Sequence, residues 1–358
     1  MTRIDSHIRN TVLLAMAVVI SLIVSVDLVF ALAEELGNTD ENYTTLNALS
    51  FILFTLPTSI YELLPFTALG GALIGLGVLA SNNELVVIQA AGVNVWRIVW
   101  SVLKPTLFIM FFGLILGEYI APPLEQLAQS NKAVQQSGNA SISSEQGSWQ
   151  KIGNEYIHIN AIAPGGRSLY GVTRYQLGED RVISASSFAE SAEYIESQQG
   201  NYWQLLNVSE SSFSPAAIST QEYLQVDWQI DLSPELLSVL LVDPDRQSIS
   251  GLYRFANFFQ SEGLDAATYF LAFWKKLLQP LATLALVVLA ISFIFGPLRE
   301  STMGFRVFAA LGIGLLFTIV QRMMEPASLL YGFSPLLAVL TPIGICAALG
   351  LYYMRRLR

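Results

Sequence analysis

Long apolar runs separated by short polar stretches dominate both ends of the chain. These runs carry one charged residue, Asp27, or none. A membrane-spanning helix needs ~20 mainly apolar residues, and the shorter runs reach that length when their flanking residues are included. The pattern predicts six transmembrane helices, three before and three after a long middle segment. They are centred on residues 10–33, 63–83, 105–117, 277–298, 307–321 and 326–354.

Two apolar stretches allow a second interpretation. Residues 45–83 give less than ~60 Å of helix at ~1.5 Å per residue, which is too short for two crossings and a turn, so one crossing with an external extension is predicted. At the N-terminus, Arg3, Arg9 and the triplet at 31–33 resemble a cleavable signal peptide. The apolar core is longer than the ~7–15 residues of such a signal, and we interpret it as a retained span.

The middle segment follows a different pattern, in which apolar and polar residues alternate, as at 156–161 and 224–230. Period-two alternation between glycine-containing turns is typical of half-buried strands. Strands are predicted near 148–152, 155–162, 167–177, 181–192, 201–213 and 220–231. The predicted fold is therefore a membrane α-helical protein, with helices arranged 3+3, that carries an inserted all-β sandwich or jelly roll. The predicted domains are 1–123, with a short helix near 82–93, then 124–245 for the β domain and 246–358 for a connector and the last three spans.

The amino-acid composition also supports an integral membrane protein. Hydrophobic residues make up 53% of the 358 residues and charged residues 13%, about half the ~25% of soluble domains, which argues against a soluble enzyme or a disordered chain. The net charge of −9 would repel a nucleic-acid backbone. One cysteine, Cys346, and two distant histidines, His7 and His158, predict no metal site and no catalytic residues. No phosphate-binding GxxxxGK[ST] motif occurs, so we expect no cofactor and no ATPase site of the chain's own.

The charges of the short loops predict the orientation. Lys and Arg of short loops are enriched on the cytoplasmic side of a membrane. The two termini, the loop between spans 2 and 3 and the loop between spans 4 and 5 lie on one side and together carry a large basic excess, so this side is predicted to be cytoplasmic. The basic residues concerned are Arg3, Arg9, Arg97, Lys104, Arg299, Arg306, Arg355, Arg356 and Arg358. The β segment, which includes most of the acidic residues, is then outside.

Two local patterns suggest interactions. Gly70, Gly71, Gly75 and Gly77 lie within a span, where small residues allow close helix packing. Residues 81–94 form an inside loop with capping asparagines, Glu84 in the first turn and Gly92 at the end. The exposed apolar residues between them predict a helix that docks in a groove of a partner protein, with a helix lying on the bilayer as the alternative.

Several strings resemble one known family in combination. They are Leu63-Leu64-Pro65-Phe66, Gly71 to Gly77, Glu84 to Gly92, Gly117-Glu118, Ala121-Pro122, Val242 to Asp245, Ser248 to Leu252 and Ser292 to Arg299. The chain resembles the lipopolysaccharide-export ABC transporter permeases of the YjgP/YjgQ family nearly end to end. The strings at 243–245 and 295–299 favour the LptG branch over the LptF branch.

This resemblance implies an inner-membrane subunit that extracts lipopolysaccharide and passes it towards the outer membrane. The implied partners are an LptF-like sister permease, an LptB-like dimeric cytoplasmic ATPase, an LptC-like single-span periplasmic protein and an LptA-like periplasmic bridge. The β domain would be periplasmic. An ABC permease for another lipid or a lipoprotein, and a membrane scaffold without transport activity, stay as alternatives.

The resemblance also assigns candidate site residues. Glu84 matches the family's coupling-helix acid, which pairs with a basic residue of the ATPase; the remaining coupling residues are Leu85, Val86, Ile88, Gln89, Ala91 and Gly92. Lys132 matches a basic residue at the lipid exit. From helical spacing, Phe317, Val320 and Met324 share one face, and with Phe66 and Arg322 they complete the predicted lipid-binding set. Alternatively, this face packs against another helix and Arg322 reaches the headgroups.

Overall fold

The computed structural model describes residues 3–39, 42–136, 148–261, 266–295 and 301–356, apart from 153, 164–165, 179–181, 198–199, 214–216, 231–232, 235–236 and 238–242. The predicted motif residues Val242 and Gly296 to Arg299 lie outside this part. The described chain divides into two compact units. One contains residues 1–30, 56–122 and 247–358, and the other contains 31–55 and 123–246.

Among the described residues, six helices are long and apolar enough to cross a membrane, which confirms the predicted number of spans. They are α1 (Arg3–Gly37), α2 (Thr45–Ser81), α4 (Val95–Ile115) with its continuation, α8 (Ala267–Phe295), α9 (Met303–Tyr331) and α10 (Pro335–Arg356). The last of them begins at Pro335 and not at 326, because residues 326–331 belong to the preceding helix. α4 continues through the π-helical turn η1 (Leu116–Ile120) into α5 (Ala121–Gln136). Residues 45–81 form one helix that passes through Pro57 and Pro65, so the prediction of a single crossing is confirmed. The shorter helices are α3 (Glu84–Ala90), η2 (Pro244–Arg246) and α7 (Ile249–Ser261).

Glycines bring α1 and α2 into close contact. A Cβ atom on Gly71 would lie 2.2 Å from Cγ of Met16 and 2.8 Å from its Cα, and one on Gly75 would lie 2.9 Å from Cα of Val12. Larger residues would separate the two helices at these positions. The packing function predicted for the glycine run is confirmed, because small residues are what let two backbones approach.

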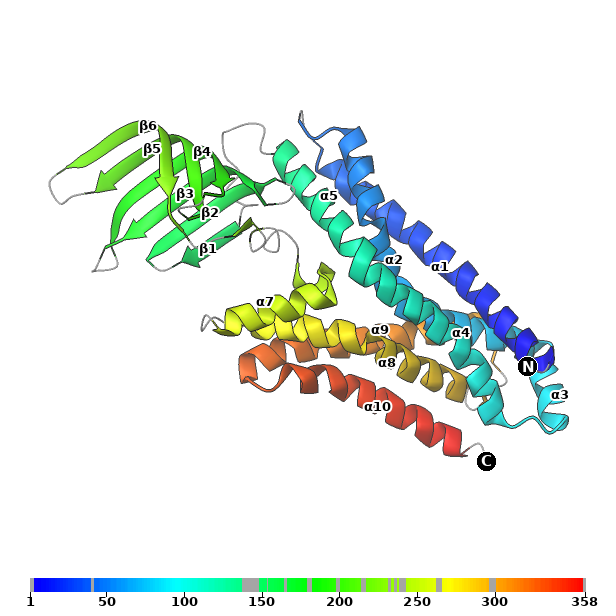
Figure 1. Cartoon of the computed structure of the whole chain (residues 1–358). Coiled ribbons are helices and arrows are strands. Elements are labelled where there is room, and N and C mark those ends of the chain that lie inside the picture. The colour runs from blue at the N-terminus through cyan, green and yellow to red at the C-terminus, as the bar shows by residue number, and fades with distance from the viewer. Residues whose placement is uncertain are drawn as a thin grey trace. The chain divides into compact units, whose positions relative to one another are not determined.

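α8 is the central helix of the second group of spans. It packs against α10, α7, α4 and α9 (Figure 1). Its contact with α10 also depends on a glycine, since a Cβ atom on Gly350 would lie 3.0 Å from the backbone nitrogen of Leu289. The apolar core around this helix includes Leu286, Val287 and Ile291.

The β domain contains one six-stranded antiparallel sheet whose strands pair in chain order. The strands are β1 (Ser148–Ile152), β2 (Glu155–Ile162), β3 (Ser168–Leu177), β4 (Ile183–Ile195), β5 (Tyr202–Phe213) and β6 (Ile218–Trp228). Each overlaps a predicted strand, so the inserted all-β domain is confirmed. The described strands form a meander, and the further arrangement into a jelly roll stays a prediction.

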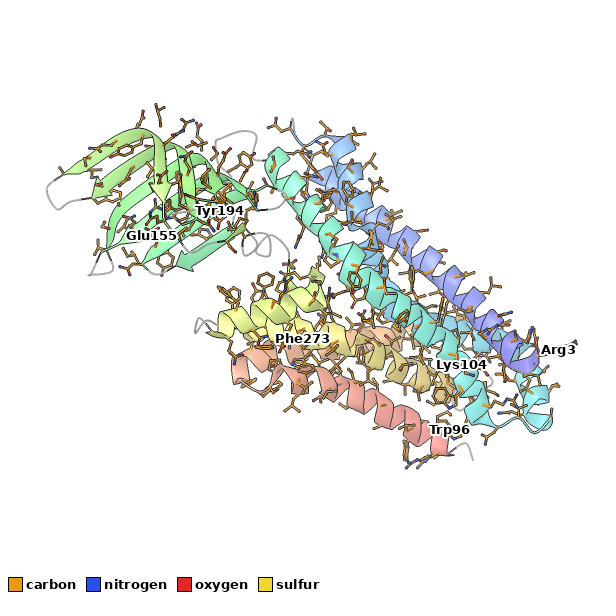
Figure 2. The ribbon with its side chains drawn as sticks, in the orientation of Figure 1. Arg3, Trp96, Lys104, Glu155, Tyr194 and Phe273 are labelled. Carbon is orange, nitrogen blue, oxygen red and sulfur yellow. The ribbon has the colours of Figure 1, made fainter. Side chains whose placement is uncertain are left out.

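One face of the sheet carries its apolar core. Ile157, Val172 and Trp203 are among the fully buried side chains. Tyr194, labelled in Figure 2, lies on β4, and its ring is 5.2 Å from that of Trp203. The strand register brings such residues together, since Ile159 of β2 is paired with Val172 of β3 and directly opposed residues share a face of the sheet. The same face also holds a buried Arg174, described below.

Candidate functional site

Helix α3 presents two different faces. Leu85 and Ile88 are buried in the helical core of the chain, whereas the side chains of Val86 and Val87 are 48% and 66% exposed. A solvated loop does not need exposed valines, and one face of a short helix is thus anchored while the other is available to a partner. Asn83 precedes the helix with a φ of 60°, a left-handed conformation that asparagine tolerates better than most residues.

Polar contacts connect the start of α1 to α3 and α4. His7 Nε2 lies 2.7 Å from Glu84 Oε2 at the surface. The Arg97 guanidinium donates to both carboxylate oxygens of Asp5, at 3.0 and 3.1 Å, a bidentate geometry that fixes orientation. Ser101 also approaches Asp5, at 3.5 Å. Through these contacts, a displacement of α3 would also displace the start of α1.

A buried arginine connects the end of α2 to the start of α9. Arg306 is 2% exposed, and its Nη1 donates to the backbone oxygen of Gly77 at 2.7 Å and to Ser81 Oγ at 3.2 Å. Buried arginines require such partners. Because α2 ends at Ser81 and α3 begins at Glu84, the arginine holds α9 next to the segment that leads into α3.

A second polar cluster joins α1 and α5 in the other compact unit. Lys132 Nζ lies 2.8 Å from Glu35 Oε1 and 4.6 Å from the ring centre of Phe51. The Tyr43 hydroxyl donates to the same Glu35 oxygen at 2.6 Å. Burial, this hydrogen bond and the Glu35 charge together raise the pKa of Tyr43. The Lys132 charge is therefore balanced within the chain.

A third cluster fixes the N-terminus of α7. Lys276, only 6% exposed, donates from Nζ to the backbone oxygen of Gln247 and lies 5.2 Å from the ring centre of Tyr61. Glu118, in η1, accepts hydrogen bonds from the backbone N–H groups of Ile249 at 2.7 Å and Ser250 at 3.2 Å. Side chains of α2, η1 and α8 thus position one end of α7.

Among the residues that the structure describes, no three His, Cys, Asp or Glu side chains gather as potential metal ligands. The polar clusters above hold helices to one another.

Comparison with known proteins identifies the family. The family model for "Lipopolysaccharide export system permease LptF/LptG" matches residues 6–356. The chain belongs to the LptF/LptG family. It is 32% identical to the lipopolysaccharide export system permease protein LptG of Escherichia coli K12 over 355 residues, covering 99% of this chain and 98% of the relative. It is 31% identical to LptG of Haemophilus influenzae over 340 residues, covering 95% and 94%.

Within this LptF/LptG chain, the predicted coupling residues separate into two groups. Leu85 and Ile88 face the chain's own core. Glu84, Val86, Gln89, Ala91 and Gly92 are exposed or half-exposed. Val87, which was not among the predicted residues, is the more exposed valine of the two. The period of the helix could have separated these groups, since residues 85 and 88 are one turn apart.

The predicted lipid-binding residues are also distributed over several environments. Phe317 and Met324 pack against a helical cluster of α8 and α10, as expected if their face contacts other helices. Phe66 lies beside Gly314 of α9, and Val320 is half-buried. Arg322 is exposed. The exposed apolar face of α9 is a different one, formed by Phe308, Leu311, Leu315, Ile319 and Met323.

Several residues of these clusters were not predicted from the sequence. Arg306 was treated as a loop charge, and Lys132 was predicted as a basic residue at the lipid exit, without its partner Glu35. In the β domain, Arg174 is 8% exposed, pairs with Glu155 at 2.9 Å and lies 4.7 Å from the ring centre of Trp228. Glu155 and Arg174, like Glu35 and Lys132, are far apart in the sequence, and no sequence pattern indicates that such oppositely charged residues form pairs.

Proposed function

We propose that this chain is the permease subunit of an ATP-driven transporter that extracts lipopolysaccharide from the inner membrane, with ATP hydrolysed by a separate subunit. Membership of the LptF/LptG family along nearly the whole chain supports this function. The observation that carries the mechanism is the position of α3, which is connected through polar contacts to α1 and adjoins the α2–α9 contact. The proposed domains are 1–123, 124–245 and 246–358.

In the proposed coupling step, an LptB-like ATPase binds the exposed face of α3. Val86 and Val87 insert into an apolar groove, and Glu84 pairs with a basic residue of the ATPase. Leu85 and Ile88 anchor α3, so that its displacement moves the neighbouring helices as well. The His7–Glu84 contact carries that displacement to α1, and Arg306 carries it to α9. These helices then narrow a lipid-lined cavity and drive the acyl chains outward.

We further propose that lipid phosphate meets Lys132 only when its ion pair with Glu35 opens. A phosphate group bears more charge than a carboxylate and offers more acceptor oxygens, so it can displace Glu35 from the ammonium. Arg322 on α9 is the second proposed phosphate contact, and its exposure leaves it accessible. The proposed acyl-chain contacts form when the helices move and expose side chains that now pack between them. These side chains are Phe66, Phe317, Val320 and Met324.

The proposed orientation has both termini in the cytoplasm and the β domain in the periplasm, based on the basic loops. The proposed partners are an LptF-like sister permease, an LptC-like single-span protein and an LptA-like bridge. Exposed apolar side chains on α1 (Leu14, Val18 and Leu22) and on α9 (Phe308 and Leu315) offer surfaces for lipid or a neighbouring permease.

Reconstitution tests this function directly. The complex containing this chain would be placed in vesicles with lipopolysaccharide, ATP and an acceptor bridge protein, and transfer of lipopolysaccharide would be followed by photo-crosslinking. ATP-dependent adducts are expected, and they should disappear when the ATPase is catalytically inactive. Transfer of a lipoprotein or another lipid in place of lipopolysaccharide would favour the alternative permease function. Failure to co-purify any ATPase would favour a scaffold.

A further inference from the structure

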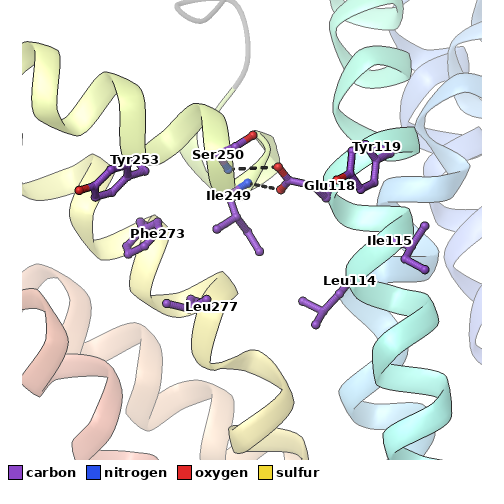
Figure 3. Close-up of a pocket in the computed structure, with 9 residues that line it drawn as sticks. All are labelled: Leu114, Ile115, Glu118, Tyr119, Ile249, Ser250, Tyr253, Phe273 and Leu277. Atoms are coloured by element: carbon purple, nitrogen blue, oxygen red, sulfur yellow. Dashed lines mark hydrogen bonds between the residues drawn. The ribbon is translucent and has the colours of Figure 1, made fainter.

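An apolar pocket lies between the α4–η1 segment and the α7–α8 pair (Figure 3). Its volume is about 570 Å³. The lining residues are Leu114, Ile115, Glu118, Tyr119, Ile249, Ser250, Tyr253, Phe273 and Leu277. Most are apolar or aromatic, and they belong to helices of one compact unit, two of which are candidate membrane spans.

The position of α7 indicates which part of a bilayer the pocket faces. Its residues Leu252 and Ala256 are buried whereas Arg254 and Asn257 are exposed, the pattern of an amphipathic helix at a membrane interface. Tyr253, 53% exposed at the pocket, is a residue type enriched at headgroup level. The pocket therefore extends from the interface towards the apolar interior along α4 and α8.

Glu118 gives this pocket a negative wall. Its two oxygens accept the N–H groups of Ile249 and Ser250, but a carboxylate offers about four acceptor positions, and the residue is only half-buried. No Lys or Arg is among the residues that line the pocket. An ammonium group suits this wall, whereas a lipid whose headgroup is only anionic does not.

We propose that the pocket binds one acyl chain of a zwitterionic phospholipid with a primary ammonium headgroup, and that Glu118 contacts the ammonium. The size argues against a partner helix, since two turns of a helix ~10 Å across would need roughly 850 Å³. The negative wall argues against lipopolysaccharide, whose sugar headgroup carries phosphates, whereas the phosphate of the proposed lipid is accompanied by an ammonium group. The proposed site is thus a structural lipid site, and it needs only that the chain spans a membrane.

Tryptophan quenching by brominated lipid tests the proposal on the full-length protein in vesicles. Tyr253→Trp places a reporter at the pocket, and Phe308→Trp, on the 71% exposed side chain of α9, reports on bulk lipid. Each variant is measured in phosphatidylethanolamine and phosphatidylcholine mixtures in which one lipid is brominated, and the quenching of the unmodified protein is subtracted. We expect Tyr253→Trp to show about threefold preference for phosphatidylethanolamine, the size of one net hydrogen bond, because its ammonium can donate to Glu118 and a choline group cannot. Phe308→Trp should show no preference.

Two further variants separate the headgroup from the cavity. Adding Glu118→Gln to Tyr253→Trp should remove the preference, because the amide keeps an acceptor for α7 but has no charge. Adding Leu277→Phe, which leaves the α7 contacts intact, should lower quenching by both lipids. Equal preference at the two reporters, absence of quenching at Tyr253→Trp, or preference for anionic phosphatidylglycerol would each overturn the proposal. Preference that survives Glu118→Gln would overturn the role of Glu118.

Discussion

Lys132 and Glu35 form a partly buried ion pair, with side-chain exposures of 19% and 7%. Removing one partner leaves the other charge in a poorly hydrated site, at a cost of up to ~3 kcal/mol. We expect Lys132→Met and Glu35→Gln each to lower the thermal unfolding temperature, and the double variant to lose less than the sum. A thermal melt of the purified complex measures this. Glu34→Gln, at the exposed neighbouring position, is the control and should have little effect.

The ion pair between Lys132 and Glu35 also allows a prediction about lipopolysaccharide binding. If phosphate competes with Glu35, Glu35→Gln should raise crosslinking of lipopolysaccharide near Lys132, and Lys132→Glu should lower it. Arg322→Glu should lower it independently. Photo-crosslinkers placed beside both positions distinguish these effects. Unchanged adducts in Lys132→Glu combined with Arg322→Glu would assign the phosphate contact to the sister permease.

We expect His158 to make the stability of the β domain depend on pH. It is 4% exposed, its ring lies 4.7 Å from that of Trp149, and burial lowers its pKa despite an opposing hydrogen bond with Asn160. Below pH ~6.5, the unfolded chain therefore binds a proton that the folded chain does not, and the free energy of unfolding falls as pH decreases towards the lowered pKa. Urea unfolding followed by hydrogen exchange of β2 should show this loss.

The control for that measurement is a histidine variant in the same domain. His158→Gln should reduce the pH dependence of β2, whereas His7→Gln, in the helical unit, should leave it unchanged. An identical pH dependence in His158→Gln would exclude His158 as the source of the effect.

At the scale of elements, variants on the two faces of α3 test the proposed coupling and the stability of the fold separately. Val87→Asp places a charge on the exposed face, where an apolar groove of the ATPase is proposed to bind, and should abolish lipopolysaccharide-stimulated ATP hydrolysis at an unchanged unfolding temperature. Ile88→Ala removes a buried anchor and should destabilise the protein by about 2 kcal/mol. Glu84→Lys should likewise abolish the stimulated ATP hydrolysis, because the new lysine would repel the basic residue of the ATPase that is proposed to pair with Glu84. Normal stimulated hydrolysis in both surface variants would exclude α3 from coupling.

Helices and strands were predictable because their periods are local. The apolar runs gave all six spans, and alternation placed strands such as β2 and β5 within one or two residues. The contacts between elements were not predictable in the same way. Arg306 with Gly77, Lys132 with Glu35 and Arg174 with Glu155 join positions whose proximity depends on the complete packing. The face of α9 that includes Phe317 was recognised as apolar, but helical spacing cannot tell a packed apolar face from an exposed one.

At the scale of the whole molecule, the orientation in the membrane is the prediction on which the proposed function most depends. The basic residues of the short loops predict that the termini and α3 lie in the cytoplasm and the β domain in the periplasm. The coupling face of α3 must be cytoplasmic to meet an ATPase. In a Cys346→Ala background, Leu224→Cys, at an 82% exposed position of β6, should react with an impermeant thiol reagent in cells with a permeabilised outer membrane. Ala91→Cys should react only after the inner membrane is also opened, and the reverse pattern would invert the orientation and exclude α3 as the coupling helix.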